Sequence, residues 1–288
     1  MGINDEETKV RLKEMEKLIY LYGLVPTEET KQISFPALEG MDKNNPIYTL
    51  CFDDITAFVC DLPSVEYSEE MLKEKIEQDM KWLQDKAMHH HETLLFLQKH
   101  YTLLPMKFCT VYKSKDSCQK SIVDNKEKTL SSLQLLKKSE EWNIKVYAHT
   151  NHLKSYLLTY SETIQKKKEE INTLPPGRQF FERKKIERLI EEETEKEQLS
   201  LCDHLHSEIS PYAAYHTIKN NWSQKITGDS YSMCWNSIYL LSKSNVESFL
   251  KAISNKQALY KNMGLNIEVT GPWPAYHIDT LRSEKDAG

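Results

Sequence analysis

Leu265-Asn-Ile-Glu-Val-Thr-Gly-Pro-Trp-Pro-Ala-Tyr276 is the stretch from which the fold is most readily worked out. Its first six residues alternate between apolar and polar side chains, as on a strand with one buried face. Two prolines then fix φ on either side of Trp273 and remove two amide donors, which ends the strand in a stiff turn. The turn presents Trp273 and Tyr276, and the indole either fills the core or anchors a partner, since Trp and Tyr are enriched among binding hot spots.

The second half of the chain leads to this strand through alternating strands and helices. Strands are predicted over 142–148, 210–217 and 234–241, and the spacing of Ser244 and Glu247 is that of a capping box for a helix beginning at Asn245. One helix is predicted over 153–171 and a charged one over 179–206, interrupted by Pro175-Pro176-Gly177. These two helices are predicted to form a hairpin that projects from the body.

The first half has a similar order of elements. Strands are predicted over 18–25, 47–52 and 55–60, the last two joined by a tight turn at Asp53-Asp54. Apolar positions at helical spacing predict one long helix from Ser68 to about Leu97, followed by an extended segment over 102–112. A charged helical connection is predicted over 114–140.

A weakly helical stretch, broken by prolines and reaching to Gly40, follows the first strand, so both halves have the order βαββαβ. This order predicts an α+β protein of two ferredoxin-like units with long charged helices, the second unit carrying the helical hairpin as an insertion. The predicted domains are an N-terminal domain over 17–113, the helical connection over 114–140 and a C-terminal domain over 141–280.

Composition narrows the class of protein. The 288 residues carry a formal net charge of -5 spread along the chain, which disfavours nucleic acid and anionic membranes as partners. No apolar run approaches the ~20 residues that span a bilayer, so a cytosolic protein is expected. The six cysteines include no CxxC pair, and reduced core thiols are predicted in preference to disulfides.

The run His89-His90-His91 is the main candidate for metal binding, because imidazoles ligate zinc or nickel. Adjacent helical residues point about 100° apart, and His90 falls on the apolar stripe, so a hydrogen-bonded histidine against the core is the favoured interpretation. For His204 and His206, too, a structural role is favoured over metal binding. GxSxG, HExxH and Gly-Lys-Ser motifs are missing from the sequence, so no catalytic, cofactor-binding or metal-binding residue is predicted.

The charged helix contains an apolar seam of Phe180, Ile186, Leu189 and Ile190. Two interpretations stand: a solvated helix stabilised by pairs such as Arg188 with Glu192, or a helix that binds a partner through the seam.

Taken together, four stretches resemble the gas vesicle F/L protein family over nearly the whole chain, from Tyr20 to about Ile278. They are Tyr20-Leu-Tyr-Gly-Leu-Val-Pro26; Ile55-Thr-Ala-Phe-Val59 with Pro63; His91-Glu92 followed by Leu104-Pro-Met-Lys-Phe-Cys-Thr-Val111; and Val269-Thr-Gly-Pro-Trp-Pro-Ala-Tyr276. Glu141 with Ile144-Lys-Val146 is a weaker fifth. The chain departs from the family at Lys107, Cys109 and Ala275, where arginine, glycine and proline are usual.

The resemblance implies a non-enzymatic, two-domain α+β protein of gas vesicle formation, located in the cytoplasm and on the gas vesicle. Its implied partners are the hydrophobic shell protein, whose aggregation it would limit during nucleation, and other gas vesicle accessory proteins. No cofactor, nucleic acid or membrane is implied, and the F or L type and the oligomeric state stay open. The predicted partner interface consists of Trp273, Tyr276, Lys107, Phe180, Ile186 and Leu189.

Two other functions compete with this one. A ferredoxin-like protein could bind a small ligand or act as an enzyme through a pocket between its two units. Nucleic-acid binding through aromatic side chains of a sheet lacks an RNP-type motif and a basic charge balance.

Overall fold

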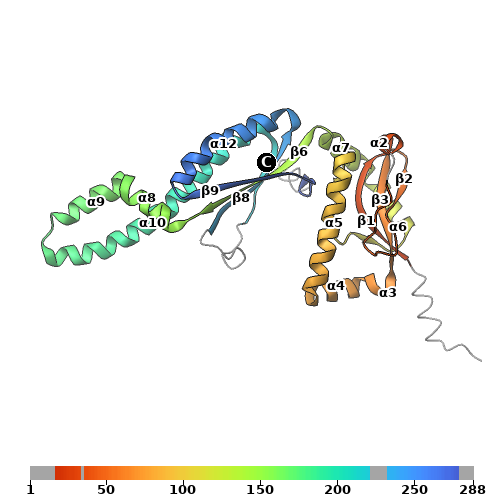
Figure 1. Ribbon diagram of the computed structural model, residues 1–288, viewed down its shortest axis with the longest axis horizontal. Helices are drawn as coiled ribbons and strands as arrows, with labels where there is room; N and C mark the ends of the chain where they lie inside the picture. The colour runs from red at the N-terminus through yellow and green to blue at the C-terminus, as the bar shows by residue number, and fades with distance from the viewer. Residues whose placement is uncertain (1–16, 34–35, 221–231, 279–288) are drawn as a thin grey trace, which may run out of the picture. The chain divides into compact units, whose positions relative to one another are not determined.

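The computed structural model describes residues 17–33, 36–220 and 232–278. The described residues divide into two compact units (Figure 1). Unit 1 holds residues up to 139 together with 274–278, and unit 2 holds 140–220 with 232–273. The predicted domain boundaries differ from this division in two places. The connection predicted over 114–140 lies in unit 1 except for Glu140, and residues 274–278, predicted to belong to the C-terminal domain, also lie in unit 1.

Unit 1 is built on an antiparallel sheet of order β2-β3-β1-β4, with β5 also pairing with β1. Its strands are β1 Lys17–Pro26, β2 Tyr48–Phe52, β3 Ile55–Pro63, β4 Leu104–Pro105 and β5 Val111–Tyr112. The predicted hairpin is confirmed: β2 and β3 pair on either side of Asp53-Asp54, and Asp53 adopts φ 53°, a conformation that Asp tolerates in tight turns.

Two helical predictions for unit 1 need correction. The single helix expected from Ser68 is two helices, because the side chain of Asp79 caps a new helix at the amide of Trp82. The expected connection 114–140 forms two helices that pack on β1 and neighbouring strands, burying Cys118 and Leu133. The helices of unit 1 are α2 Thr27–Gln32, α3 Ser64–Tyr67, α4 Glu69–Gln78, α5 Met80–His100, α6 Lys115–Asp124 and α7 Lys126–Leu136.

The extended segment predicted over 102–112 is also wrong in part. Only its two ends are strand residues, and a turn separates them. The hydroxyl and amide of Thr110 both donate to the Lys107 carbonyl, and Cys109 lies in the left-handed region with φ 63°. The turn places the backbone of Met106 and Cys109 beside α5 and β1.

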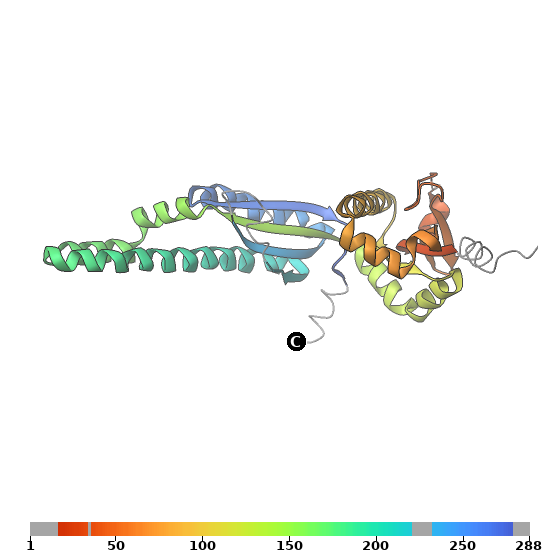
Figure 2. The ribbon, with the colours of Figure 1, turned by 90° about the horizontal axis from the view of Figure 1, so that it is seen from below.

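Unit 2 is built on a second antiparallel sheet, of order β7-β8-β6-β9. Helices α10 and α12 pack on it, and α8 and α9 lie along α10, as both views of the ribbon show (Figure 2). The elements are β6 Ser139–Ala148, α8 Thr150–Tyr160, α9 Glu162–Asn172, α10 Pro176–Ile209, η1 Ser210–Tyr212, β7 Ala213–Ile218, β8 Ser232–Ser242, η2 Lys243–Asn245, α12 Val246–Asn262 and β9 Leu265–Trp273.

Two details of unit 2 differ from the sequence-based expectation. The helix predicted over 153–171 is divided by Ser161, whose side chain caps α9 at the amide of Ile164. The predicted capping box does not form: the hydroxyl of Ser244 bonds to Ser242 and Asn245, and a 3-10 turn precedes α12.

The α+β class is confirmed, with antiparallel sheets and helices in both units. That each unit is ferredoxin-like in detail, and that α8 to α10 form a hairpin insertion, stays a prediction. In the described part of the chain, no helix is both long enough and apolar enough to cross a bilayer.

Candidate functional site

The three consecutive histidines of α5 each share a hydrogen bond with a different tyrosine hydroxyl in unit 1. The pairs are His89 Nε2 with Tyr22 at 3.1 Å, His90 Nδ1 with Tyr20 at 2.9 Å, and His91 Nδ1 with Tyr276 at 2.9 Å. These six residues are called the histidine–tyrosine cluster below. Tyr20 and Tyr22 point to the same face of β1 because they are two residues apart.

His90 lies at the centre of the cluster, and its surroundings determine its tautomer. The Met106 carbonyl is 3.2 Å from His90 Nε2 and can only accept, so Nε2 carries the proton. Nδ1 therefore accepts from the Tyr20 hydroxyl, which in turn accepts from the Cys109 amide at 3.2 Å. Every polar atom of the His90 ring is satisfied, and the ring holds the 106–109 turn against β1.

Burial keeps the cluster neutral. The side chain of His90 is 3% exposed, and burial lowers its pKa to about 4. Burial also lowers the pKa of His89 and of His91, and it raises the pKa of Tyr20 and of Tyr22 above that of a free tyrosine. At neutral pH, Tyr20, Tyr22 and His90 therefore form a neutral, hydrogen-bonded part of the core, and the other three members of the cluster are half-buried.

This arrangement confirms the core interpretation of His90 and leaves it no lone pair for a metal ion. Among the described residues, no three His, Cys, Asp or Glu side chains are grouped so that they could hold a metal ion. Residues from three of the four stretches that resemble the gas vesicle family meet in the cluster, in β1, in α5 with the following turn, and at Tyr276.

The predicted end of the last strand at Gly271 is wrong: β9 continues to Trp273, which pairs with Glu141 of β6, and Gly271 lies within the strand where the pairing shifts register. Gly271 has φ +150° and lies against the ring of Trp142, where an added Cβ would come within 2.8 Å of a ring carbon. The indole of Trp273 donates to the Thr270 hydroxyl at 3.0 Å and is half-buried. Trp273 belongs to unit 2, whereas Tyr276 belongs to unit 1 and packs on its core.

The other predicted interface residues differ in accessibility. Lys107 is exposed on the turn of unit 1, and Phe180 in the first turns of α10 is 62% exposed. Ile186 and Leu189 are half-buried along α10. Within unit 2 the first turns of α10 lie far from the end of β9 (Figure 1), so Phe180 and Trp273 do not form one surface.

Sequence reasoning missed Phe181, which is 67% exposed and packs edge-to-face on Phe180 at 5.7 Å. The signal was the adjacency of two phenylalanines in a charged helix, since only one of two neighbours can point along a single seam.

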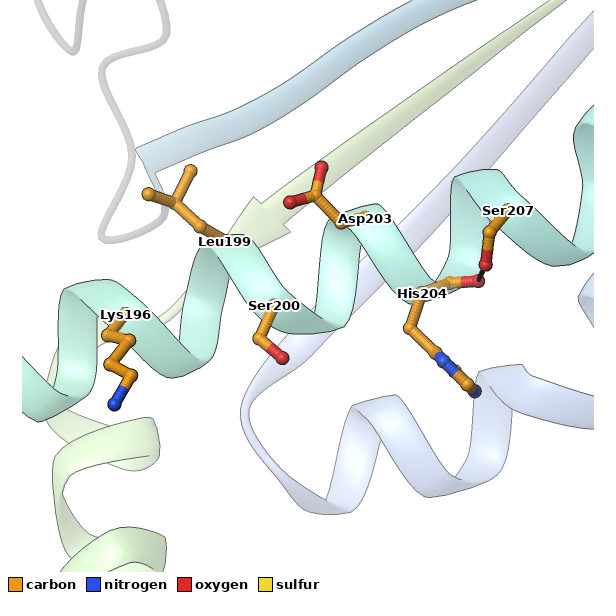
Figure 3. A pocket seen from close by; sticks show the side chains of 6 residues that line it. All are labelled: Lys196, Leu199, Ser200, Asp203, His204 and Ser207. Atoms are coloured by element: carbon orange, nitrogen blue, oxygen red, sulfur yellow. Dashed lines mark hydrogen bonds between the residues drawn. The ribbon is translucent and has the colours of Figure 1, made fainter.

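A shallow hollow also runs along α10 in unit 2 (Figure 3). All its lining side chains come from this one helix: Lys196, Leu199, Ser200, Asp203, His204 and Ser207. His204 Nε2 lies 3.3 Å from Glu208. No second element contributes a lining residue, so polar groups do not converge on the hollow from two sides. This arrangement does not favour a small-ligand site there.

A second histidine–tyrosine pair lies on the sheet of unit 2. His206 Nδ1 is 2.7 Å from the Tyr239 hydroxyl, and its ring centre is 4.8 Å from that of the exposed His216. Nearby, the buried sulfurs of Cys202 and Cys234 approach to 3.7 Å, and the neighbouring thiol together with burial raises the pKa of Cys202.

The comparisons with known proteins agree with the resemblance. A family model described as gas vesicle synthesis protein GvpL/GvpF matches residues 18–277. Gas vesicle protein L of Streptomyces sp. (strain CB03234) is 23% identical over 80% of this chain and 82% of its own length. Gas vesicle protein L1 of Halobacterium salinarum is 22% identical over 89% of this chain and 88% of its own length.

Solved structures show the same fold. The crystal structure of GvpF from Anabaena sp. PCC7120 superposes with a TM-score of 0.64 at 18% identity, covering 90% of this chain and 97% of that one. GvpF from Microcystis aeruginosa gives a TM-score of 0.57 at 17% identity over the same shares. Since the family model spans both units, the chain belongs to the GvpL/GvpF family of gas vesicle synthesis proteins.

Proposed function

We propose that this protein is a non-enzymatic accessory factor that binds the hydrophobic shell protein and other accessory proteins while gas vesicles form, and limits shell-protein aggregation. The observation that carries the proposal is the family match along 18–277, which supports an accessory role in gas vesicles. The proposed location is the cytoplasm and the surface of the gas vesicle.

The binding role needs apolar surface on an otherwise soluble protein. Phe180 and Phe181 offer such a surface in the first turns of α10, surrounded by charged side chains such as Lys184, whose ammonium lies 5.5 Å from the Phe180 ring centre. We propose Phe180 as the main shell-protein contact, with Lys107, Ile186, Leu189, Trp273 and Tyr276 as further interface residues. Tyr276 already bonds to His91, so its contribution would be through its ring.

We also infer that each βαββαβ unit is a ferredoxin-like module and that α8 to α10 form the inserted hairpin of the second. Numbered within each unit, the strands of both sheets lie in the order 2-3-1-4, and α10 contacts both α8 and α9.

Deleting the gene in a vesicle-forming host tests the role. We expect loss or marked reduction of vesicles, and restoration by the wild-type gene. In parallel, the purified protein should retain the shell protein in a pull-down and delay its aggregation as followed by light scattering. Normal vesicles in the deletion strain, together with no shell-protein binding, would overturn the proposal.

A further inference from the structure

An exposed stripe runs along α10 on the side away from its own unit. Six side chains at alternating spacings of four and three residues form this stripe, the spacing with which helices pair in coiled coils. They are Phe181, Lys185, Arg188, Glu192, Glu195 and Leu199. All six are classed as exposed, including Phe181 at 67% and Leu199 at 56%.

The opposite side of α10 is the packed one. At about 100° per residue, Ile186, Ile190 and Thr194 lie roughly half a turn from the stripe, and Thr194 is buried where α9 and α8 contact α10. The stripe is therefore not the face that α8 and α9 cover.

The stripe has an internal symmetry. In chain order its side chains are apolar, basic, basic, acidic, acidic and apolar, so the pattern is chemically complementary to itself when reversed about residue 190. The whole helix follows this division: up to Arg188 it carries five basic and two acidic side chains, and from Leu189 onward one basic and seven acidic.

We propose that α10 pairs antiparallel with α10 of a second copy of this chain, about a twofold axis beside residue 190. Phe181 would contact Leu199 of the second copy, Lys185 would pair with its Glu195, and Arg188 with its Glu192. Phe181 and Leu199 are five helical turns apart, about 27 Å, so both lie on the same side of the helix. An apolar contact would therefore form at each end of the stripe. A twofold arrangement makes each contact twice.

The charge order selects this partner and orientation. A parallel pair would set Lys185 against Lys185 and Glu195 against Glu195, which is repulsive, whereas the reversed pair matches opposite charges at every polar position. Arg188 already bonds to Glu192 of its own helix at 2.9 Å, with both side chains largely exposed. In the pair these residues would form a cluster of four alternating charges.

Sedimentation velocity of the full chain over a broad concentration series tests the pairing. We expect a reversible monomer–dimer equilibrium that weakens at high salt, because the polar contacts are exposed ion pairs. Lys185→Glu with Arg188→Glu makes all four polar positions of the stripe acidic, and Glu192→Lys with Glu195→Lys makes all four basic. Each double variant should raise the dimer Kd by at least about tenfold.

Mixing the two variants is the decisive step. Their stripes are complementary at all four polar positions, so an equimolar mixture should regain the dimer, which also shows that both variants are folded. The control is Lys166→Glu with Lys251→Glu, two exposed lysines outside α10 whose exchange alters the net charge by the same amount as the acidic variant. A wild-type monomer throughout, a mixture that stays monomeric, or a control that loses the dimer equally would overturn the proposal.

The pairing is independent of the proposed vesicle function. A dimer without shell-protein binding would leave the pairing standing, and shell-protein binding by a monomer would leave the vesicle role standing.

Discussion

Each unit sets a histidine from a helix against a tyrosine from a strand, but the two pairs use their imidazoles differently. In unit 1, His90 is 3% exposed and both of its ring nitrogens are bonded, to the Tyr20 hydroxyl and the Met106 carbonyl. In unit 2, His206 is half-buried, bonds to Tyr239 through Nδ1 and lies beside the exposed His216.

This difference indicates that the His90 pair, and not the His206 pair, links several elements of its unit. The His90 ring connects a helix, a strand and a turn, and residues from the stretches that resemble the gas vesicle family supply its partners. Burial lowers the pKa of both histidines, and for His206 the charge of His216 adds to this effect, but only His90 has no ring atom left for solvent. The family signature therefore marks a structural core in unit 1 more directly than it marks a binding surface.

Replacing His90 by Leu should have the largest effect. The change leaves the Met106 carbonyl and the Tyr20 hydroxyl without their partner in the core, and each unsatisfied group costs about 1–3 kcal/mol, so we expect a loss of about 4 kcal/mol in the free energy of unfolding. Urea unfolding measures the loss, and hydrogen exchange of the β1 amides assigns it to unit 1. The matched control is His100→Leu, the same exchange at an exposed position of the same helix, and equal losses for both variants would refute the structural role of His90.

The sequence predicts the elements of this architecture well where they depend on residues that are neighbours in the chain. The β2–β3 hairpin follows from local turn chemistry at Asp53-Asp54, and β9 follows from strict alternation, so both are correct. The break at Asp79 was missed because apolar residues continue at helical spacing through α4, although none of them is buried. Periodicity reports a helical face without showing where a capping side chain restarts the helix.

The cluster itself is beyond sequence reasoning for a different reason. Its tyrosines are 67, 70 and 185 residues from their histidines, and no local pattern encodes such pairings. What the sequence does supply is the position of His90 on the apolar stripe of the helix, and from this its core role was correctly predicted. The turn at Cys109 was missed because alternation over 102–112 also fits a continuous strand, while the left-handed φ of Cys109 has no sequence signal.

Acid should affect unit 1 next most strongly. The folded-state pKa of His90, about 4, lies below the ~6.5 of an unfolded histidine, so the unfolded state binds the proton first and stability falls as pH drops from about 6.5 to about 4. The expected loss across this window is about 3 kcal/mol, with no contribution from His90 above it. Urea unfolding at several pH values measures it, and the His90→Leu variant should have a visibly flatter profile. Parallel profiles for the two proteins would contradict the assignment.

Gly271 is a closely packed position of β9 in unit 2, and its replacement should have a smaller effect. Gly271→Ala would force a Cβ to within 2.8 Å of the Trp142 ring at φ +150°, and we expect a loss of about 2 kcal/mol. Gly177→Ala is the control, because nothing lies within 4 Å of a Cβ added there and alanine favours a helix. Thermal unfolding of both variants measures the difference, and a stabilised Gly271→Ala variant would show that the strand adjusts freely at this position.

The smallest effect on stability should come from the surface that we propose for binding. Phe180 is 62% exposed, so Phe180→Ser should change the free energy of unfolding by less than about 0.5 kcal/mol. The same change should weaken capture of the shell protein severalfold, because an exposed aromatic ring contributes to binding and not to the core. Tyr160→Ser, at 68% exposure on α8, removes another exposed ring of unit 2 and should leave capture unchanged. If both variants weaken capture equally, binding depends on the total exposed apolar surface and not on Phe180. If neither variant weakens capture, the binding surface lies elsewhere, and the first turns of α10 do not have the role proposed for them.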